Sequence, residues 1–401
     1  MKHSFLRTQR TKIVDARGRE IFLRGVNLGG WLMMEGYFLQ APNIGVRKFK
    51  KEFAARLGEK ALQDFERAFY GTFIQEEDFK RVAQMKLNCI RLPFHHGLIE
   101  TESYRYSAKG VAYLDQAIRW AKKYSLYIIL DLHGAAGCQN HDWHSDSLGK
   151  AELWSNKNFQ KRTAALWEFL ADRYRDESTV AGYDLLNEAV ITDEKKLNDL
   201  YRMIIQAIRS ADKNHVLFVE GNKWATDLKC LERFHDHNLA LSIHFYHPID
   251  FSFNFVPSLR YPLRYQGVKW DRAMLGRMAA SYARAAKKYG APVFVGEFGV
   301  NDRDNVHHEI DYLKDVLSCF DAHDFHWTYW TYKAVKHTMF PDGLFSYYPN
   351  SPWVNRQGPK TGWDTYADLW PRHKKDIIES WKTKYFTPNT KAIKALSSCQ
   401  A

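Results

Sequence analysis

The sequence predicts a single (β/α)8 barrel, and three observations lead to this fold class. Short apolar runs alternate eight times with segments that have helical period and charge. The runs are nearly continuously hydrophobic, as parallel strands buried on both faces must be. Eight such units within 401 residues match a closed barrel with elaborated loops. A doubly wound open sheet is the alternative, but Arg24 to Gly30 lacks the G-x-G-x-x-G turn that such a sheet usually carries.

The expected elements follow in order along the chain. Thr11 to Leu23 predicts a small hairpin, with its turn at Arg17 and Gly18, that plugs the bottom of the barrel. Strands are expected at residues 21–28, 89–94, 127–132, 182–187, 215–220, 239–246, 292–297 and 326–332. Helices are expected over residues 110–124, 158–174, 194–211, 270–289, 306–320 and 369–384. Residues 1–401 form one domain in this prediction, with a core of about 15–385 and a loose C-terminal tail.

Composition excludes several classes of protein. Apolar residues make up 45% and charged residues 26% of the chain, the proportions of a soluble globular protein. No run of about 18 uncharged apolar residues occurs, so we expect no membrane span. Aromatic residues reach 15%, which fits either a core rich in rings or a groove for a flat, weakly charged ligand such as a sugar.

The chain is basic, with 58 Lys and Arg against 46 Asp and Glu and a formal net charge of +12. These residues are scattered, and their densest cluster is 47–51. We interpret the charge as a solvated surface and expect no nucleic-acid partner. A barrel that bound nucleic acid would instead show salt-sensitive binding to DNA or RNA.

The five cysteines are widely spaced, odd in number and without a C-x-x-C pair, which favours reduced thiols over disulfides or a zinc site. The N-terminus has no apolar signal core, and no N-x-S/T acceptor occurs. We therefore expect a cytoplasmic protein, with a trimmed secreted form as the alternative, and a monomer.

Polar side chains recur where the predicted strands end, at the face where barrels of this kind carry their chemistry. A purely structural barrel gives no reason for this pattern, because a buried carboxylate is costly unless it is paired. The residues concerned are Asn27, Arg91, His133, Asn187, Glu188, Glu220, His244, Tyr246, Glu297 and Trp330.

Glu188 and Glu297 are the candidate catalytic pair. They end the fourth and seventh runs, on opposite sides of the barrel, so their side chains can face each other across its mouth. Two carboxylates about 5–5.5 Å apart are what a retaining glycosidase uses. Arg91 can keep one of the two carboxylates ionised, and Tyr246 can donate a hydrogen bond to the same oxygen of that carboxylate. The second carboxylate lies near this negative charge and is partly desolvated, so we expect it to favour its protonated form. For either glutamate alone, a salt-bridge role is the alternative.

This set of residues resembles the signature of glycoside hydrolase family 5 in order and strand assignment, over about residues 15–370. The resemblance implies that Glu188 is the acid/base and Glu297 the nucleophile of a retaining enzyme that needs no metal or organic cofactor. It also implies supporting roles. Asn187 would bind the sugar 2-hydroxyl, Arg91 and Tyr246 would orient Glu297, His244 would support the acid/base, His133 would contact the sugar, and Trp330 would form the floor of the −1 subsite.

Further segments resemble the exo-β-1,3-glucanase and β-glucosidase branch of that family, at residues 24–32, 131–137, 139–140 and 180–188. Departures are Ala189, where Pro is usual, the loop at 139–144, and an aromatic stretch after Trp330. The resemblance thus predicts hydrolysis of β-glucosidic bonds in a β-glucan or β-glucoside, with an oligo- or polysaccharide as the partner. The alternatives are an endo-β-1,4-glucanase of the same family and a non-catalytic barrel that binds oligosaccharides.

Other polar residues near the strand ends have two readings each. His141, Asp142 and His144 could form a metal site with His133, although we favour a polar substrate loop. One of the adjacent pair His95 and His96 is expected to face the cleft, or else to hydrogen-bond a loop carbonyl.

Glu35 is expected to touch substrate hydroxyls or a nearby Arg, and Glu220 to hold a neighbouring side chain. Among the tryptophans, Trp143 lies in a polar loop and is expected to contact sugar. Trp31, Trp154 and Trp353 are weaker stacking candidates, because Trp buries a large area wherever it lies.

Overall fold

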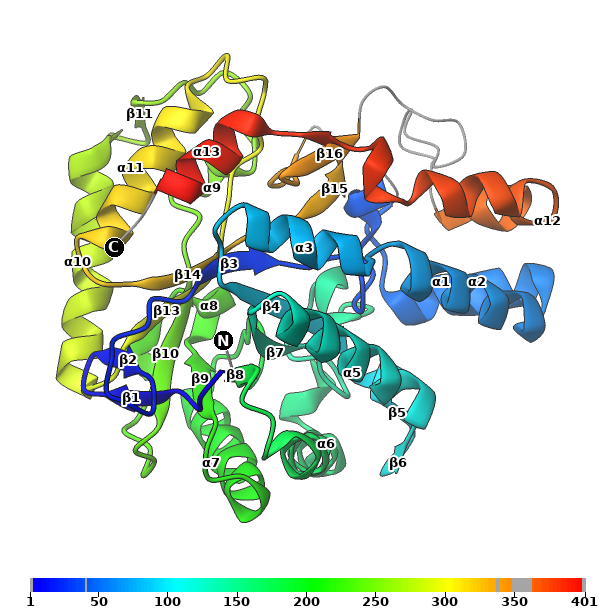
Figure 1. Cartoon of the computed structure of the whole chain (residues 1–401), viewed down its shortest axis with the longest axis horizontal. Helices are drawn as coiled ribbons and strands as arrows, with labels where there is room; N and C mark the ends of the chain where they lie inside the picture. Colours follow the sequence, from blue (N-terminus) through cyan, green and yellow to red (C-terminus); the bar gives the residue numbers. More distant parts are fainter. Residues whose placement is uncertain (1–2, 40–41, 337–338, 348–362, 399–401) are drawn as a thin grey trace.

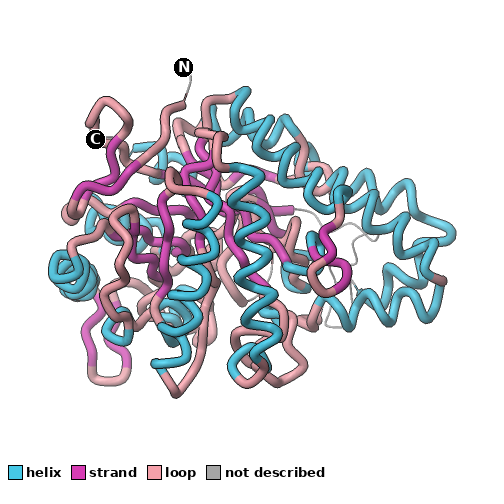
Figure 2. Tube along the Cα trace, turned by 90° about the horizontal axis from the view of Figure 1, so that it is seen from below, coloured by secondary structure: helices cyan, strands magenta, loops and turns pink. Residues whose placement is uncertain are grey.

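The computed structural model describes residues 3–39, 42–336, 339–347 and 363–398, and a closed barrel of eight parallel strands lies at its centre (Figures 1 and 2). The strands follow one another around the barrel in chain order. They are β3 (Arg24–Asn27), β4 (Cys89–His95), β7 (Tyr127–Gly134), β8 (Val180–Asp184), β9 (Val216–Glu220), β10 (Leu239–His244), β13 (Val293–Phe298) and β14 (His326–Tyr329). Every residue in them except Arg24 is buried, because helices cover the outer face and side chains fill the interior. The predicted fold class and its eight strands are confirmed.

Further helices follow the barrel strands, and those longer than four residues lie close to the predicted positions. They are α4 (His96–Ile99), α5 (Ala108–Lys123), α6 (Lys157–Tyr174), α7 (Glu194–Ala211), α8 (Asn222–Ala225), α9 (Ile249–Ser252), α10 (Arg272–Tyr289), α11 (Glu309–Asp321) and α12 (Trp363–Ser380). Local caps set several boundaries. The Ser107 hydroxyl accepts from the Gly110 N–H, and the Asp271 carboxylate accepts from the Met274 N–H.

Three helices that the sequence analysis did not assign lie between the first and second barrel strands. They are α1 (Val46–Leu57), α2 (Glu59–Thr72) and α3 (Glu76–Gln84). Helices α1 and α2 extend from one side of the barrel together with α12 (Figure 1). Phe65 of α2 contacts Trp370 of α12 with ring centroids 5.1 Å apart, so aromatic packing joins these two helices.

The bottom of the barrel is plugged as predicted, although the hairpin lies nearer the N-terminus. Its strands are β1 (Arg7–Gln9) and β2 (Lys12–Val14), and the turn expected at Gly18 forms a second bend beside them. Leu6, Ile13 and Leu23 pack against apolar side chains at the bottom of the barrel, which belong to Cys89, Tyr127, Ile129, Ala181, Val216, Phe218, Ala240 and Phe294.

The C-terminus differs from the prediction of a loose tail. Helix α13 (Thr390–Ser398) buries Ala392, Ala395 and Leu396, and the Ser397 hydroxyl donates to the carbonyl of Met85. Strand β17 (Thr387–Pro388) joins β15 (Lys333–Val335) and β16 (Phe345–Tyr347) in a small sheet. Two further hairpins are β5 (Glu100–Glu102) with β6 (Arg105–Tyr106), and β11 (Leu263–Tyr265) with β12 (Val268–Trp270).

Within the residues that the structure describes, no helix combines the length and apolar character needed to cross a bilayer. Cys89, Cys138, Cys230 and Cys319 are free and buried, as predicted, while Cys399 lies outside the described residues.

Candidate active site

Arg91, on β4, is the centre of the polar network at the mouth of the barrel. Its side chain has an exposed fraction of 0%, and an isolated charge there would be strongly unfavourable. Its guanidinium is instead surrounded by acceptors, and its planar fork of donors matches several at once. The partners are Asp184 at 2.9 Å, Glu297 at 2.8 Å, Glu220 at 3.0 Å, Asp131 at 3.2 Å, Asn187 at 2.8 Å and Asn27 at 3.2 Å.

Glu297, near the end of β13, is fixed through both carboxylate oxygens. Arg91 Nη1 donates to Oε1 at 2.8 Å, and the Tyr246 hydroxyl donates to Oε2 at 3.0 Å. The sequence analysis expected both donors at one oxygen. Two donors on different oxygens fix the plane of the carboxylate, which suits a nucleophile that must attack from one direction.

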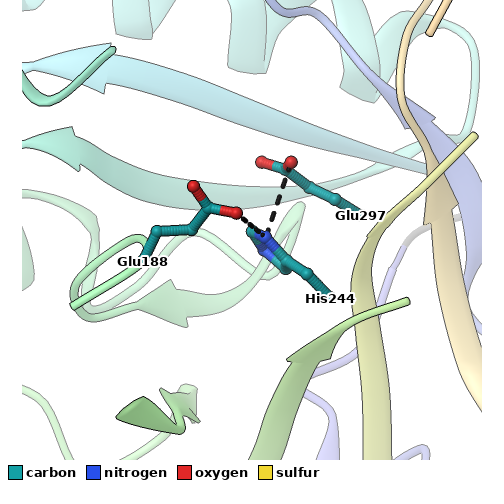
Figure 3. A group of neighbouring side chains, drawn as sticks. All are labelled: Glu188, His244 and Glu297. Carbon is teal, nitrogen blue, oxygen red and sulfur yellow. Dashed lines mark hydrogen bonds and ion pairs between the residues drawn. The ribbon is translucent and has the colours of Figure 1, made fainter. Parts of the chain in front are cut away.

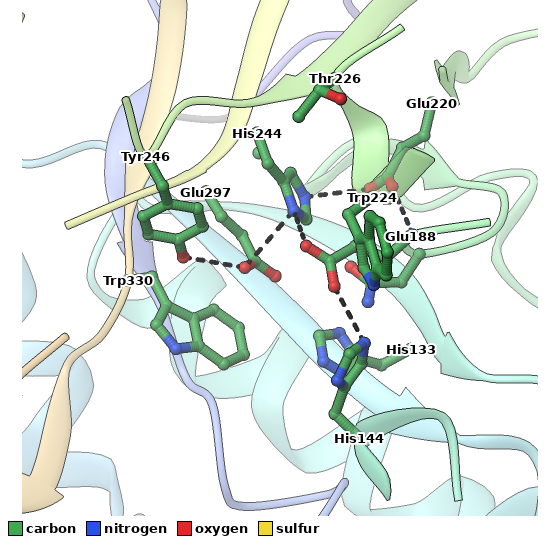
Figure 4. Close-up of polar contacts among 12 residues, drawn as sticks. His133, His144, Glu188, Glu220, Trp224, Thr226, His244, Tyr246, Glu297 and Trp330 are labelled. Carbon is green, nitrogen blue, oxygen red and sulfur yellow. Dashed lines mark hydrogen bonds and ion pairs between the residues drawn. The ribbon is translucent and has the colours of Figure 1, made fainter. Parts of the chain in front are cut away.

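Glu188 lies in the loop just beyond β8 and contacts a different imidazole with each oxygen (Figures 3 and 4). Its Oε1 is 2.6 Å from His244 Nδ1, and its Oε2 is 3.0 Å from His144 Nε2. Its backbone φ is +48°, a left-handed conformation that is costly for a residue with a side chain. Glu220 holds that conformation, because its Oε2 accepts the Glu188 N–H at 2.6 Å.

The two glutamates converge. One oxygen of Glu188 and one of Glu297 lie within 4.8 Å of each other, with His244 between them (Figure 3). Such closeness matches the separation of about 5–5.5 Å in retaining glycosidases and not the roughly 6.5–9.5 Å of inverting ones. The same three side chains meet the distances of a metal site. However, the Arg91 charge on Glu297 and the His244 contact to Glu188 already satisfy these oxygens, which disfavours a cation.

The charges around Glu188 overturn one expectation. Burial raises the pKa of the Glu188 carboxyl, but the contacts with His144 and His244 outweigh it and leave that pKa well below its usual value. Burial likewise lowers the pKa of His244, yet neighbouring carboxylates, led by Glu297, hold it well above the ordinary value. These contacts therefore favour the carboxylate form of Glu188 and the imidazolium form of His244.

Burial raises the pKa of two further carboxyl groups. Burial, followed by the charge of Glu220, raises the pKa of Asp184 well above its usual value. Burial, followed by the charges of Glu297 and Glu188, does the same for Glu35. Glu35 Oε1 has no hydrogen-bond partner among the described residues and lies 3.9 Å from His133 Nε2. Of its two predicted roles, the free oxygen favours contact with a substrate hydroxyl over an Arg pair.

An aromatic wall closes the Glu297 side of the mouth. The His133 ring lies parallel to Trp330 with centroids 5.4 Å apart, and Asp131 accepts from His133 Nδ1 at 2.8 Å. The Trp330 indole N–H donates to the Tyr37 hydroxyl at 2.6 Å. Trp143 is half-buried against Tyr37, so the predicted sugar-contact residue belongs to this wall.

Several predicted residues do not reach the cleft. Asn27 lies beneath the site, where its side chain donates to the carbonyl of Gly296 and accepts from Arg91. Of the two alternatives for His95 and His96, the hydrogen bond to a carbonyl is the one that His96 shows. His95 Nε2 is 3.0 Å from Asp146, and His96 contacts the carbonyl of Gly134, because a short helix begins at once after β4 and turns both rings into the loop.

The remaining tryptophan candidates are structural or outside the described residues. The Trp31 and Trp154 indoles donate to the carbonyls of Tyr70 and Gln139 within the core, and Trp353 lies outside the described residues.

Sequence reasoning missed two residues at this site. His144 was assigned to a metal site or, preferably, to a polar substrate loop, but its contact with Glu188 was not foreseen, and His141 contacts the Gly149 carbonyl instead. Trp224 was not considered. It lies beside Glu188, with 45% of its surface exposed, and its indole donates to Asp142 Oδ2 at 2.8 Å (Figure 4). The ring is exposed by a turn in which residues 223–225 are all left-handed, with φ between +53° and +58°. The turn could not be predicted, because none of these three residues is of a type that favours a positive φ.

The comparisons with known proteins agree with this geometry. Residues 48–336 match the family model described as Cellulase (glycosyl hydrolase family 5). A "Beta-xylosidase" of Phanerodontia chrysosporium is 34% identical over 83% of this chain and 71% of its own length. "Endoglucanase C" of Acetivibrio thermocellus is 26% identical over 80% of this chain and 93% of its own. A "Probable glucan 1,3-beta-glucosidase A" of Aspergillus clavatus is 28% identical over 69% and 64%.

Among solved structures, Thermotoga maritima Cel5A in complex with cellobiose superposes with a TM-score of 0.62 at 20% identity, covering 94% of this chain and 96% of that one. At this identity the likeness concerns the fold alone, and it agrees with the barrel described above.

Proposed function

Because the chain belongs to glycosyl hydrolase family 5 and is a glycoside hydrolase, we propose that it acts by retention on β-glucosides, removing sugars from the end of a β-glucan or a short oligosaccharide. Glu188 protonates the leaving oxygen while Glu297 attacks the anomeric carbon. Glu188 then removes a proton from the water, or the second sugar, that displaces Glu297. The convergence of the two carboxylates within 4.8 Å carries the proposal.

The two sides of the cleft support an exo mode of action. On the Glu297 side, Tyr37, Trp330 and Trp143 pack against one another, an arrangement that fits a cleft closed beyond the −1 position. On the Glu188 side, where the leaving group departs, Trp224 offers an exposed ring (Figure 4). Sugars stack well on such rings because their apolar faces cover aromatic surface.

A β-xyloside is the second candidate substrate, favoured by the 34% identity to the protein named a β-xylosidase. Glucose and xylose differ by the hydroxymethyl group at C5, and one such group changes recognition by about 1–3 kcal/mol in a shaped pocket. The endo-β-1,4-glucanase alternative draws its support from the relative named "Endoglucanase C".

A matched panel separates these substrates. The protein is assayed on aryl β-glucoside and aryl β-xyloside, then on laminari-, cello- and xylo-oligosaccharides, with product lengths read by chromatography. We expect monosaccharide as the first product and higher kcat/KM on glucosides. Products of two or more sugars at the earliest times would contradict the exo mode, and a preference for xylosides would replace the first candidate with the second.

A further inference from the structure

A second cleft lies between α1 and the loop that joins β7 to α6. Its volume is about 730 Å³, within the range of sites that bind small molecules. The residues that line it are Arg47, Lys48, Lys51, Glu52 and Ala55 of the helix, and Cys138, Leu148, Lys150 and Glu152 of the loop. None of these residues belongs to the catalytic network described above, so the cleft is separate from the candidate active site.

Helix α1 divides its side chains between the core and this cleft. Phe49 and Phe53 are buried, and the ammonium of Lys50 turns toward α2, where it is 2.6 Å from Glu66. Residues 47, 48, 51, 52 and 55 share the opposite face of the helix, and this face lines the cleft. The densest basic cluster of the sequence, at 47–51, is therefore split between an ion pair with the next helix and a charged cleft.

The two walls of the cleft are joined through Arg47 and Asp146. The Arg47 backbone N–H donates to Asp146 Oδ1 at 2.9 Å, and its Nε donates to Oδ2 at 2.5 Å. Its Nη2 donates to the Asp146 carbonyl at 3.1 Å. These contacts offset the charge of Arg47 and fix the distance between helix and loop, so the cleft is preformed.

The positive charge that remains belongs to lysines. Glu52, 3.9 Å from the Lys48 ammonium, offsets that charge. Lys51 and Lys150 line the cleft from opposite walls, and their ammonium groups form no hydrogen bond or ion pair within the part of the chain that the structure describes. Glu152 is the carboxylate that opposes them. Two unpaired ammonium groups on facing walls favour an anionic ligand that pairs with both.

The length and lining of the cleft indicate the kind of anion. From residue 47 to residue 55 the helix rises by about 12 Å, which is longer than a single phosphate or sulfate ion. Ala55 and Leu148, which is 75% exposed, offer apolar surface for the C–H groups of a sugar ring. The lining residues given above include no aromatic ring, so a neutral sugar would lack a stacking surface there.

We propose that this cleft is a second carbohydrate site that binds an acidic oligosaccharide, with the carboxylates of its uronic acid residues paired to Lys51 and Lys150. The loop links the two sites, because it also places Trp143 and His144 at the mouth of the barrel. Lys150 follows His144 by six residues, so their Cα atoms lie at most about 22 Å apart. One polymer chain can therefore contact both sites. The inference adds a site to the proposed function and does not depend on which glycosidic bond is cleaved.

The test measures binding of a β-1,4-linked oligoglucuronate by isothermal titration calorimetry, in a Glu297→Gln background so that the probe is not hydrolysed. We expect Lys51→Gln/Lys150→Gln to raise the Kd by about 5- to 10-fold, because two ion pairs are lost. Glu152→Gln should lower it by about 2- to 3-fold, since a repelling charge is removed. Binding should weaken between about 20 and 200 mM salt, as expected for exposed charges. The Kd for a neutral cello-oligosaccharide of the same length should not change in these variants.

The matched control is Lys287→Gln/Lys288→Gln, which removes the same charge from exposed positions on α10 and should leave the Kd unchanged. An unchanged Kd in the Lys51 and Lys150 variant, or an equal rise in the control, overturns the proposal. Displacement of the probe by an equal concentration of inorganic phosphate would overturn the assignment of a saccharide and indicate a general anion site.

An activity assay separates this inference from the proposed function. In the enzyme with an intact nucleophile, Lys51→Gln/Lys150→Gln should keep the wild-type kcat/KM on an aryl β-glucoside, because the second cleft shares no residue with the catalytic network. A fall in that value would overturn the separateness of the two sites. A wild-type enzyme without activity on any β-glycoside would refute the proposed function and leave the measured binding site in place.

Discussion

The same strands form both ends of the barrel, but the bottom is an apolar packing layer and the mouth is a charged site. In β9, Phe218 packs in the apolar layer at the bottom, and Glu220, two residues later, joins the charged layer at the mouth. In β13, Phe294 lies in the apolar layer and Glu297, three residues later, lies at the mouth, with an irregularity in the strand register between Val295 and Phe298. Strand side chains alternate in direction, so a step of two residues keeps a side chain on the same face while moving it toward the mouth. One short strand thus supplies both packing and chemistry.

Because packing and chemistry occupy opposite ends of the barrel, stability and activity can be changed separately. The apolar layer excludes water from below, which strengthens the ion pairs of Arg91 above it. Substitutions at the mouth should therefore reduce turnover in a folded protein, and substitutions at the bottom should reduce stability in a protein that still turns over.

The largest effect is expected for Glu297→Ala. Loss of the nucleophile should reduce kcat on an aryl β-glucoside by at least about 10⁴-fold. Added azide should restore turnover and give the inverted glycosyl azide, because it attacks from the side that Glu297 vacates. Circular dichroism and thermal unfolding serve to check that the Glu297→Ala variant is folded. Rates near wild type would remove Glu297 from the chemistry.

The next effect is expected for Glu188→Ala and depends on the leaving group. Poor leaving groups should lose about 10²–10⁴-fold, since general acid catalysis contributes that much. Good leaving groups, which need no proton, should lose far less in the first step. Azide should here give the retained product, which distinguishes this variant from Glu297→Ala. A uniform loss across leaving groups would contradict an acid role.

At the opposite end, Phe218→Ala should destabilise the fold and spare the chemistry. The ring is fully buried and lies 4.8 Å from that of Phe294, so its loss should cost about 3–5 kcal/mol in unfolding free energy. Denaturant unfolding measures this loss, with Leu148→Ala as the control because Leu148 is 75% exposed. A large fall in kcat for the folded variant would show that the two ends are not separable.

The smallest effect is expected for Trp224→Ala. Loss of one exposed stacking ring on the leaving-group side should raise KM for an oligosaccharide by about 5- to 10-fold. KM for an aryl glucoside, which has no second sugar, should change less. Tyr385→Ala, an exposed aromatic beside Glu379, is the matched control. Equal effects on both substrates would argue against a sugar platform.

The sequence predicted the parts of the molecule that depend on strand pattern. Eight apolar runs and the polar residue after each were enough to place Arg91, Glu297 and Tyr246 together, because parallel strands bring their carboxyl ends to one face. The glutamate pair followed from the same pattern.

What could not be predicted depends on loop conformation. His144 lies beside Glu188 because Asn140 binds the loop to the Glu188 carbonyl. Trp224 lies in a left-handed stretch of backbone that its residue types do not predict. The sequence left open whether His95 or His96 faces the cleft, because the direction of both rings depends on α4, which begins immediately after the strand. Helices α1 and α2 had a readable apolar spacing, as at Phe49 and Phe53, but lie outside the strand–helix alternation on which the prediction was built.

In the proposed mechanism, Glu297 forms a covalent bond to the sugar with Glu188 beside it. The most direct measurement is inactivation by a 2-deoxy-2-fluoro-β-glucoside with a good leaving group, followed by mass spectrometry of the digested protein. The fluorine slows both steps and lets the glycosyl-enzyme accumulate. We predict one fluorosugar per molecule, attached to the peptide that contains Glu297. A fluorosugar on another residue, or complete turnover without label and with inverted product, would contradict the account.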